Sequence, residues 1–354
     1  MMMLRLVYAL ILGFVALNCL QVFEESNAQR IPRDEVKALQ AISDKLENVN
    51  WKVTERYCIE DGGFNGKINI DNDIFGDDSF LKGQNISGVF PSEFGNLTQL
   101  KELDLTRNYL SGSLPTNFSP NSLVVLSLLG NRLSGRIPTE IGDIASLEEL
   151  VLECNQLEGP LPPSFGNLSK LKRLLLSANN FTGTIPETYS KLKNLTEFRI
   201  DGSSLSGPIP SFIGNWTNLI RLDLQGTNME GPIPPTISQL KLLTELRITD
   251  LNGGPSMTFP DLKNLTKLKR LELRNCLITG SIPGYIGEMA NLATLDLSFN
   301  MLTGSVPDSI QKLDNLDYLD LSYNNFTNSS ATSCQLLDVN LASSHFSSAV
   351  TSAS

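Results

Sequence analysis

The clearest pattern along the chain is an alternation of leucines and polar residues that returns about every 24 residues. In residues 100–105, for example, Leu103 and Leu105 alternate with Glu102 and Asp104. An alternation of period two predicts a short strand with one buried face and one exposed face. The motif L-x-x-L-x-L, with Phe or Ile at some leucine positions, begins at Leu100, Leu123, Leu147, Leu171, Leu195, Leu219, Leu243, Leu268, Leu292 and Leu316. Such a repeat predicts stacked coils around one continuous core, with the strands aligned in a parallel sheet.

An asparagine follows the strand in many coils, at Asn108, Asn131, Asn155, Asn179, Asn300 and Asn324. A buried Asn in a turn can bond backbone groups of its own and the neighbouring coil, so we expect a ladder along the stack. Ser203, Thr227 and Cys276 replace it in three coils. A degenerate first coil is expected before Leu100, with Leu81 matching Leu105 one period later.

The turn after the asparagine contains a further signature. In residues 110–115, Gly112 relieves the backbone and Pro115 prevents further helix. This L-x-G-x-I-P extension resembles the plant-specific class of leucine-rich repeats. The resemblance implies an α/β-type repeat solenoid, a curved right-handed superhelix with a parallel sheet on its concave face, a second short strand in each coil and a helical N-terminal cap.

The chain divides into four segments by composition. Arg5, the apolar run 6–17 and the small residues Ser26 and Ala28 predict a cleaved signal peptide over 1–28, the alternative being an uncleaved anchor. Residues 29–75 are expected to form the cap, including an amphipathic helix over 32–46 with Val36, Leu39, Ile42 and Leu46 on one face. The solenoid of about eleven coils spans 76–328, and 329–354 is a polar, partly disordered tail. No later stretch is apolar enough for a membrane helix, which predicts secretion to the extracellular space.

Charge and motifs exclude several classes of function. A net charge of -10 without any Lys/Arg run argues against nucleic acid. The one histidine, His345, lies in the predicted tail, and no metal, phosphate-loop or triad motif occurs. We therefore expect no enzyme activity, no cofactor and no metal site.

Sequons are dense for a chain of this length. Acceptors are predicted at Asn85, Asn96, Asn167, Asn180, Asn194, Asn215, Asn264, Asn325 and Asn328, whereas Asn117 is disfavoured by the nearby Pro120. Asn96, Asn167, Asn194, Asn215 and Asn264 are expected at one position of the repeat, on the convex or flanking side, which would leave the concave sheet free.

Four cysteines follow the predicted signal peptide: Cys58, Cys154, Cys276 and Cys334. Cys154 and Cys276 lie five coils apart, roughly 24 Å at the spacing of adjacent strands, which is too far for a disulfide. Cys58 and Cys334 belong to opposite ends of the rod. We predict no disulfide within the chain, a buried ladder position for Cys276 and partial exposure of Cys154.

The outward strand positions give three candidate binding surfaces. Charges alternate around Arg199, Asp223, Arg247 and Arg270, which fits either a self-neutralised ladder or a polar ligand groove. An exposed apolar patch is expected at Val125, Leu129, Val151 and Leu175, and an aromatic cluster for a partner protein at Phe299, Tyr318 and Tyr323. Residues 251–260 lack the ladder Asn and carry an extra residue, so this coil is either a tolerated variation or a kink that shapes a site.

Residues 94–108, FGNLTQLKELDLTRN, closely resemble plant receptor-kinase ectodomains that carry a malectin-like domain after the repeats. The resemblance implies an extracellular module that binds a peptide, a protein or a co-receptor ectodomain, or a cell-wall glycan, with no phosphotransfer by this chain. It also implies truncation before the malectin-like, membrane and kinase parts, and a plasma-membrane location for any longer form. The alternative is a secreted inhibitor of cell-wall-degrading enzymes similar to polygalacturonase inhibitors, against which the lone Cys58 and Cys334 count.

Overall fold

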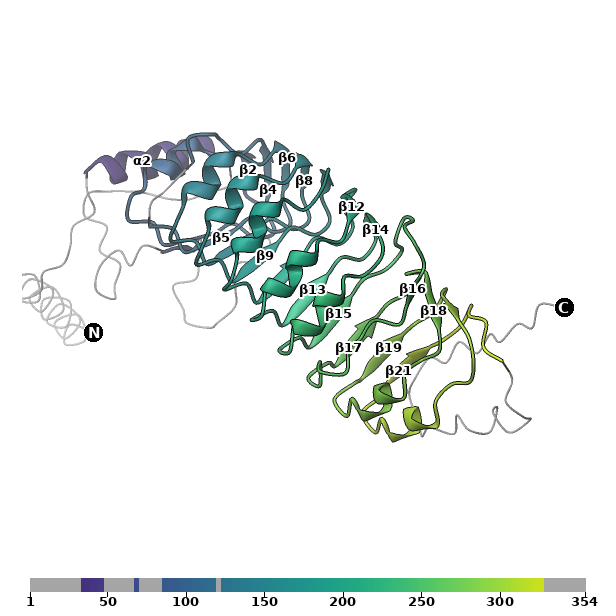
Figure 1. The fold of residues 1–354 in the computed structure, drawn as a ribbon. Helices are drawn as coiled ribbons and strands as arrows, with labels where there is room; N and C mark the ends of the chain where they lie inside the picture. Colours follow the sequence, from purple (N-terminus) through teal and green to yellow (C-terminus); the bar gives the residue numbers. More distant parts are fainter. Residues whose placement is uncertain (1–32, 48–66, 70–84, 119–121, 328–354) are drawn as a thin grey trace, which may run out of the picture.

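The chain winds into a long rod of stacked coils, with the helical cap at its N-terminal end (Figure 1). The computed structural model describes residues 33–47, 67–69, 85–118 and 122–327. The predicted signal peptide, Cys58, Leu81, Asn328, Cys334, His345 and the tail lie outside these residues. No helix within the described ranges is long and apolar enough to cross a bilayer.

One strand from each coil joins an eleven-stranded parallel sheet in the order β1-β3-β5-β7-β9-β11-β13-β15-β17-β19-β21. The register moves each coil by one repeat, as in the pairing of Phe198 with Leu174 and Leu222. The strands are β1 (Lys67–Asn69), β3 (Glu102–Asp104), β5 (Val125–Ser127), β7 (Glu149–Val151), β9 (Arg173–Leu175), β11 (Glu197–Arg199), β13 (Arg221–Asp223), β15 (Glu245–Arg247), β17 (Arg270–Glu272), β19 (Thr294–Asp296) and β21 (Tyr318–Asp320).

A second strand follows in the L-x-G-x-I-P segment of most coils, as the resemblance implied. These strands form three shorter parallel sheets, one of five, one of two and one of three strands. They are β2 (Ser87–Val89), β4 (Tyr109–Gly112), β6 (Arg132–Arg136), β8 (Gln156–Pro160), β10 (Asn180–Thr182), β12 (Ser206–Pro208), β14 (Asn228–Glu230), β16 (Met257–Thr258), β18 (Ile278–Gly280) and β20 (Met301–Leu302).

A 3-10 helical turn follows the proline that recurs in the repeat; it completes most coils and returns the chain to the sheet. Each begins after an extended proline, such as Pro138 or Pro162, whose missing N–H costs nothing at a helix start. The turns are η1 (Ser92–Asn96), η2 (Thr139–Asp143), η3 (Pro163–Asn167), η4 (Glu187–Lys191), η5 (Ser211–Asn215), η6 (Pro235–Gln239), η7 (Gly284–Glu288) and η8 (Asp308–Lys312).

The leucines of the repeat form one continuous core along the rod. Leu103, Leu126, Leu150 and Leu174, from successive strands, have no exposed surface. Each coil covers the core side chains of its neighbours, so these leucines are shielded from water without a second layer of secondary structure. The expected leucine-rich-repeat solenoid is confirmed.

The asparagine ladder is confirmed as well. Asn131 donates to the carbonyl oxygens of Leu105 (2.9 Å) and Leu128 (3.0 Å) and accepts from the Leu110 N–H (3.0 Å). One side chain thus satisfies backbone groups of its own coil and of the previous one. In the Cys276 coil the Sγ donates to the Ile248 carbonyl at 3.1 Å, which confirms the buried ladder position of this cysteine.

The cap helix α2 (Arg33–Lys45) closes the N-terminal end of the core. Its buried face includes Val36 and Ile42, with Leu39 packed at the margin of the core and the buried Leu46 directly after the helix, which confirms the predicted amphipathic helix. Lys45 forms an ion pair with Glu93 of η1. The sheet's first strand differs from expectation, because β1 pairs Lys67 with Glu102, 35 positions later rather than 24. The first coil is therefore longer than one repeat.

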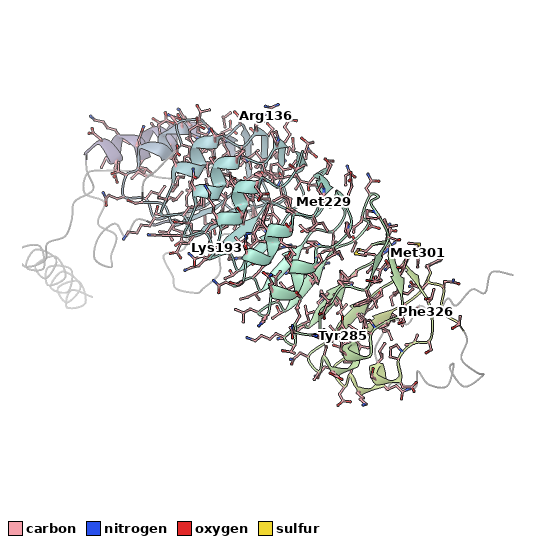
Figure 2. The ribbon with its side chains drawn as sticks, in the orientation of Figure 1. Arg136, Lys193, Met229, Tyr285, Met301 and Phe326 are labelled. Atoms are coloured by element: carbon pink, nitrogen blue, oxygen red, sulfur yellow. The ribbon has the colours of Figure 1, made fainter. Side chains whose placement is uncertain are left out.

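The irregular coil leaves the main sheet intact. Glu245 still pairs with Arg270, so the extra residue is absorbed between β15 and β17. This coil has no 3-10 turn among residues 251–269, and the Tyr285 hydroxyl bonds the backbone there instead, donating to the Pro260 carbonyl at 2.8 Å and accepting from the Leu262 N–H at 3.1 Å (Tyr285 is labelled in Figure 2). Leu251, in place of the ladder Asn, is buried. At the level of the sheet, the coil is a tolerated variation.

The predicted acceptor asparagines that the structure describes are all exposed, and so is Asn117. Asn96, Asn167 and Asn215 end the 3-10 turns η1, η3 and η5, and Asn264 occupies the same repeat position. Asn194 was wrongly grouped with them: it lies three positions later in its coil, directly before Leu195, and its amide donates to the Ser169 carbonyl. None of the described sequons lies on a strand of the eleven-stranded sheet.

Candidate ligand-binding face

Ion pairs run along the outward side of the main sheet in three groups, here together called the ion-pair ladder. Its arginines are Arg173, Arg199, Arg221, Arg247 and Arg270, and its carboxylates are Glu149, Glu153, Glu197, Asp201, Asp223, Glu245 and Glu272. Strands that pair in parallel and in register place Arg221 between Glu197 and Glu245, and Asp223 between Arg199 and Arg247, of the coils before and after. The four residues predicted as a polar groove are all members of this ladder.

Asp223 shows how far this neutralisation goes. Its carboxylate is fully buried and accepts from Arg247 Nη1 at 2.8 Å and from Arg221 Nη2 at 3.5 Å. Burial raises the pKa of Asp223, which the charge of Arg247 partly offsets. At Glu272, burial acts in the same direction, but hydrogen bonds from Arg247 and Arg270 hold the pKa of its carboxyl below the usual value. Of the two interpretations of these charges, the structure supports the self-neutralised ladder.

The expected apolar patch is wrong at two of its four positions. Val151 is 8% exposed and Leu175 only 2%. Arg199, the neighbour of Leu175 in the sheet, reaches across that coil to Glu153, with 3.2 Å between Nη1 and Oε1. We attribute the burial of Leu175 to the aliphatic stem of this arginine. The strand pattern had placed Leu175 in solvent, and the charged side chain of Arg199 from the next coil accounts for the difference.

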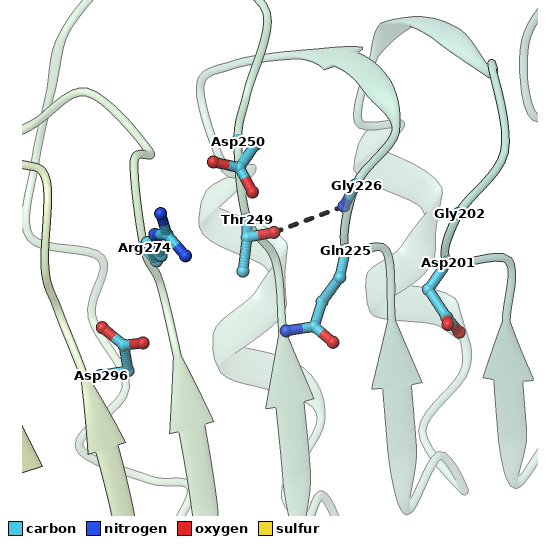
Figure 3. A pocket seen from close by; sticks show the side chains of 8 residues that line it. All are labelled: Asp201, Gly202, Gln225, Gly226, Thr249, Asp250, Arg274 and Asp296. Carbon is cyan, nitrogen blue, oxygen red and sulfur yellow. Dashed lines mark hydrogen bonds between the residues drawn. The ribbon is translucent and has the colours of Figure 1, made fainter.

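A polar groove of about 400 Å³ lies beside the ladder, past the C-terminal ends of strands β11 to β19. Figure 3 shows its walls. It is lined by Asp201, Gly202, Gln225, Gly226, Thr249, Asp250, Arg274 and Asp296. Of these, only Asp296 lies on a strand of the main sheet. The others follow the strand end, so they belong to a separate surface.

Two glycines explain why the groove opens at this point. The residue before the ladder position has a left-handed backbone in the coils from Arg107 to Tyr323, and most coils place a side chain there, as at Cys154, Ala178 and Asn275. Gly202 and Gly226 occupy this position in successive coils, with φ of 66° and 57°. Without side chains, these two coils leave an exposed backbone floor. Two glycines at one repeat position, 24 residues apart, were the sequence signal for the groove.

Beside this floor, Arg274 stands between Asp250 and Asp296 (Figure 3). Its guanidinium lies 4.6 Å from the centre of the Phe299 ring and forms no ion pair within the described chain. Phe299 in turn stacks on Tyr323, with 4.1 Å between ring centres and 18° between planes. We call Arg274, Phe299 and Tyr323 the aromatic stack. Sequence reasoning found its two rings but missed the arginine that extends them to the groove.

The structure brings together two of the three predicted aromatic residues. Phe299 is 40% exposed and Tyr323 58%. Tyr318, 36% exposed, starts strand β21 and makes no ring contact with them in the described structure. Burial raises the pKa of the Tyr318 hydroxyl, and the carboxylates Asp296 and Asp320 raise it further. Tyr318 thus lies beside the carboxylates Asp296 and Asp320, which together with Asp250 we call the acidic surface, rather than in the aromatic stack.

The two described cysteines lie in different environments. Cys276 is buried, and burial raises the pKa of its thiol, which keeps it protonated. Cys154 is exposed at the left-handed position of its coil, with φ of 55°. Among the described residues, no group of three or more His, Cys, Asp or Glu side chains is arranged to hold a metal ion.

Comparison with protein families identifies the repeats. The model described as "Leucine rich repeat" matches residues 145–205 and 258–326, and a second, "Leucine Rich Repeat", matches 99–121 and 218–240. Two probable leucine-rich-repeat receptor-like serine/threonine-protein kinases of Arabidopsis thaliana are 56% identical over 310 residues and 54% identical over 299 residues. These alignments cover 83% and 79% of the chain but only 30% and 28% of the relatives.

Solved structures with the same fold include plant hormone receptors. The plant peptide hormone receptor RGFR1 in complex with RGF2 is 36% identical, with a TM-score of 0.64, over 68% of this chain and 38% of that one. The Arabidopsis receptor kinase HAESA, in complex with the peptide hormone IDA and the co-receptor SERK1, is also 36% identical, with a TM-score of 0.64, over 68% of this chain and 40% of that one. The chain is thus a leucine-rich-repeat solenoid, and its fold is that of plant receptor-kinase ectodomains.

Proposed function

We propose that the chain is an extracellular recognition module of the receptor-kinase-ectodomain type, which binds a peptide or protein ligand on its concave face. The observation that carries this proposal is the polar groove beside the aromatic stack, next to a sheet on whose strands no described sequon lies. A rigid sheet holds both features, and binding residues on a rigid scaffold lose little entropy when a ligand is bound. The named complexes of RGFR1 and HAESA, which contain peptides, support the same class of ligand.

The groove can be tested with a variant that carries a glycan. Gly202→Asn creates an Asn-Ser-Ser sequon with Ser203 and Ser204, so a secreting host would attach a glycan at the groove floor. The full chain, secreted from plant cells, is incubated with peptides from extracellular fluid, and bound peptides are identified by mass spectrometry. We expect Gly202→Asn to lose the peptides that the wild type captures.

Two controls separate this effect from misfolding. Gly202→Ala adds only a Cβ, whose nearest neighbours are backbone atoms of Ala178 at 3.8 Å, and should retain binding. Asn167→Gln removes a predicted glycan from the end of η3, away from the main sheet, and should also retain it. Capture of the same peptides by the wild type and by Gly202→Asn would contradict a ligand site in the groove.

We further propose secretion through the predicted signal peptide and membership of the malectin-containing group, with the chain as part of a longer membrane receptor. The resemblance of residues 94–108 supports the malectin-containing group, and the receptor-kinase relatives, of whose length the chain spans only about 30%, support a longer receptor. An immunoblot of extracellular and membrane fractions with an antibody against the repeats distinguishes a secreted chain from a membrane receptor. A large membrane-bound band supports a receptor, whereas a soluble band near the chain's own mass supports a secreted decoy. The alternative of an enzyme inhibitor gains no support from these relatives.

A further inference from the structure

We infer that the polar groove and the acidic surface beside it take a peptide segment that carries an arginine or lysine side chain. The inference rests on the ligand-binding function proposed above and adds the chemical class of the ligand. Its three supports are the open floor of the groove, an excess of carboxylates over basic groups at this end of the concave face, and an aromatic face next to that charge.

The floor has room for a peptide backbone. A Cβ placed on Gly226 would meet only the Gly202 nitrogen, at 3.9 Å, so the space above both glycines is open. Gln225 and Thr249 line the same space with polar side chains. A volume of about 400 Å³ matches a few residues of an extended segment rather than a folded domain. The groove therefore suits a short peptide stretch.

Charge is balanced in the ladder but not at this end. The ladder carboxylates Asp223 and Glu272 each contact two arginines. In contrast, Asp250, Asp296 and Asp320 have no basic group within 4.0 Å in the described structure, and their hydrogen bonds come from Asn275, Ser298 and Ser322. Asp296 and Asp320 are direct neighbours across β19 and β21. Among the residues that line the groove, Arg274 is the one cation beside the three aspartates Asp201, Asp250 and Asp296, so the groove has a net negative charge that attracts a cationic group.

The aromatic stack supplies a second contact for such a group. Arg274 itself packs its guanidinium on the Phe299 ring, 4.6 Å from the ring centre, so these rings accept a cationic group on their face. Tyr323, stacked on Phe299, is 58% exposed and presents ring surface to solvent. A ligand guanidinium or ammonium group gains from the aromatic face and from the carboxylates together. A neutral ligand group gains from the rings alone, and an acidic group is repelled by the carboxylates.

The test uses the full secreted chain on arrays of synthetic octapeptides with random flanks and a fixed central residue. Arrays with central Arg or Lys should bind about tenfold more protein than arrays with central Gln, and central Glu should bind least. Raising the salt from 0.05 to 0.5 M should reduce the preference. Equal binding to the Arg and Gln arrays would overturn the inference.

The double variant Asp296→Asn, Asp320→Asn tests the residues themselves. Both amides keep an oxygen for Ser298 and Ser322, so the turns are preserved. We expect the preference for Arg and Lys over Gln to fall to about onefold. The matched control is Asp314→Asn with Asp317→Asn, two exposed positions off the main sheet that change net charge equally. A preference retained by the first pair, or lost by the control pair, contradicts the assignment.

The two proposals fail in different ways. If Gly202→Asn abolishes the captured peptides but the arrays show no preference for basic residues, ligand binding stands and the basic ligand class is wrong. If binding of a neutral β-glucan oligosaccharide is detected instead and is lost in Gly226→Asn, the groove recognises a glycan and the peptide class is wrong. If Gly202→Asn changes nothing, the proposed function itself fails.

Discussion

A single ladder asparagine holds two coils together, because its amide reaches backbone groups that no water can satisfy. At Asn131, the bonds to Leu105, Leu128 and Leu110 are all buried. Where the ladder residue is smaller, it forms fewer hydrogen bonds of this kind. Thr227 makes one such bond, to the Leu224 carbonyl, and the buried Ser203 hydroxyl has no partner in the described structure.

Asn131→Ala should therefore lower the free energy of unfolding by about 2–4 kcal/mol, because it leaves several buried backbone groups unpaired. Urea unfolding followed by circular dichroism measures the change. Asn291→Ala removes one exposed bond of the same type, to the Thr266 carbonyl, and should cost less than about 1 kcal/mol. Equal costs for the two variants would show that the ladder contributes no more than a surface contact.

Asp296 gives a pH-dependent prediction. Burial raises the pKa of its carboxyl, hydrogen bonds from Ser298 oppose this, and Asp320 and Glu272 add repulsion. Since the folded pKa lies above the unfolded one, the folded state loses stability relative to the unfolded state as pH rises through that range. Asp296→Asn removes the loss. Its melting temperature should match the wild type near pH 3.5 and exceed it at pH 7.

The comparison for Asp296→Asn is Asp314→Asn, at an exposed position. A gain in melting temperature at pH 7 in the control, or a gain for Asp296→Asn that is already complete at pH 3.5, would rule out burial of this carboxylate as the cause. If the gain appears while binding of basic peptides is lost, Asp296 lowers stability but contributes to ligand binding.

At the scale of one element, the 3-10 turns pack so closely on the following coils that five of their glycines, Gly95, Gly142, Gly166, Gly214 and Gly287, admit no side chain. A Cβ on Gly166 of η3 would lie 2.4 Å from the Thr188 carbonyl oxygen of the next turn. Gly142 and Gly287 meet the following coil in the same way. Gly284 of η7, in contrast, has no atom within 4 Å of its Cβ position.

Gly166→Ala should lower the free energy of unfolding by about 2 kcal/mol or more, because backbone of η4 cannot yield to the methyl group. Gly284→Ala, in a turn of the same type, should be neutral or gain about 0.5 kcal/mol from reduced freedom of the unfolded chain. Chemical unfolding of both variants gives the comparison. Similar losses would mean that backbone freedom, and not the contact with η4, decides the role of Gly166.

Most elements of this fold were predictable because each follows from a local pattern. Leucine alternation predicted the strands and residues 32–46 predicted the cap helix, whereas the 3-10 turns that begin after the prolines were not predicted. The binding face was less predictable, because it depends on how side chains from different coils meet. Leu175 is buried by Arg199, and the groove exists because Gly202 and Gly226 adjoin. The position of β1 was missed because its coil departs from the repeat length.

At the scale of the whole rod, the described sequons divide the surface into a part that is expected to carry glycans and a part without glycans. We expect glycans on the described and exposed Asn85, Asn96, Asn167, Asn180, Asn194, Asn215, Asn264 and Asn325, because an exposed sequon is accessible to the transferase. Enzymatic release in heavy-oxygen water followed by peptide mapping identifies the occupied sites. Occupancy confined to one or two of them would contradict a solenoid whose concave face is the main uncovered surface.

The coil in which Leu251 replaces the ladder asparagine has a mechanical consequence. Neighbouring coils are joined by bonds that run along the axis, so a tensile load on the two ends passes through every interface in series, and the weakest interface yields first. The Leu251 coil lacks both the amide rung and the 3-10 turn. Stretched by its ends, the rod should therefore part beside this coil, close to the groove, and its two halves should rupture as separate force peaks.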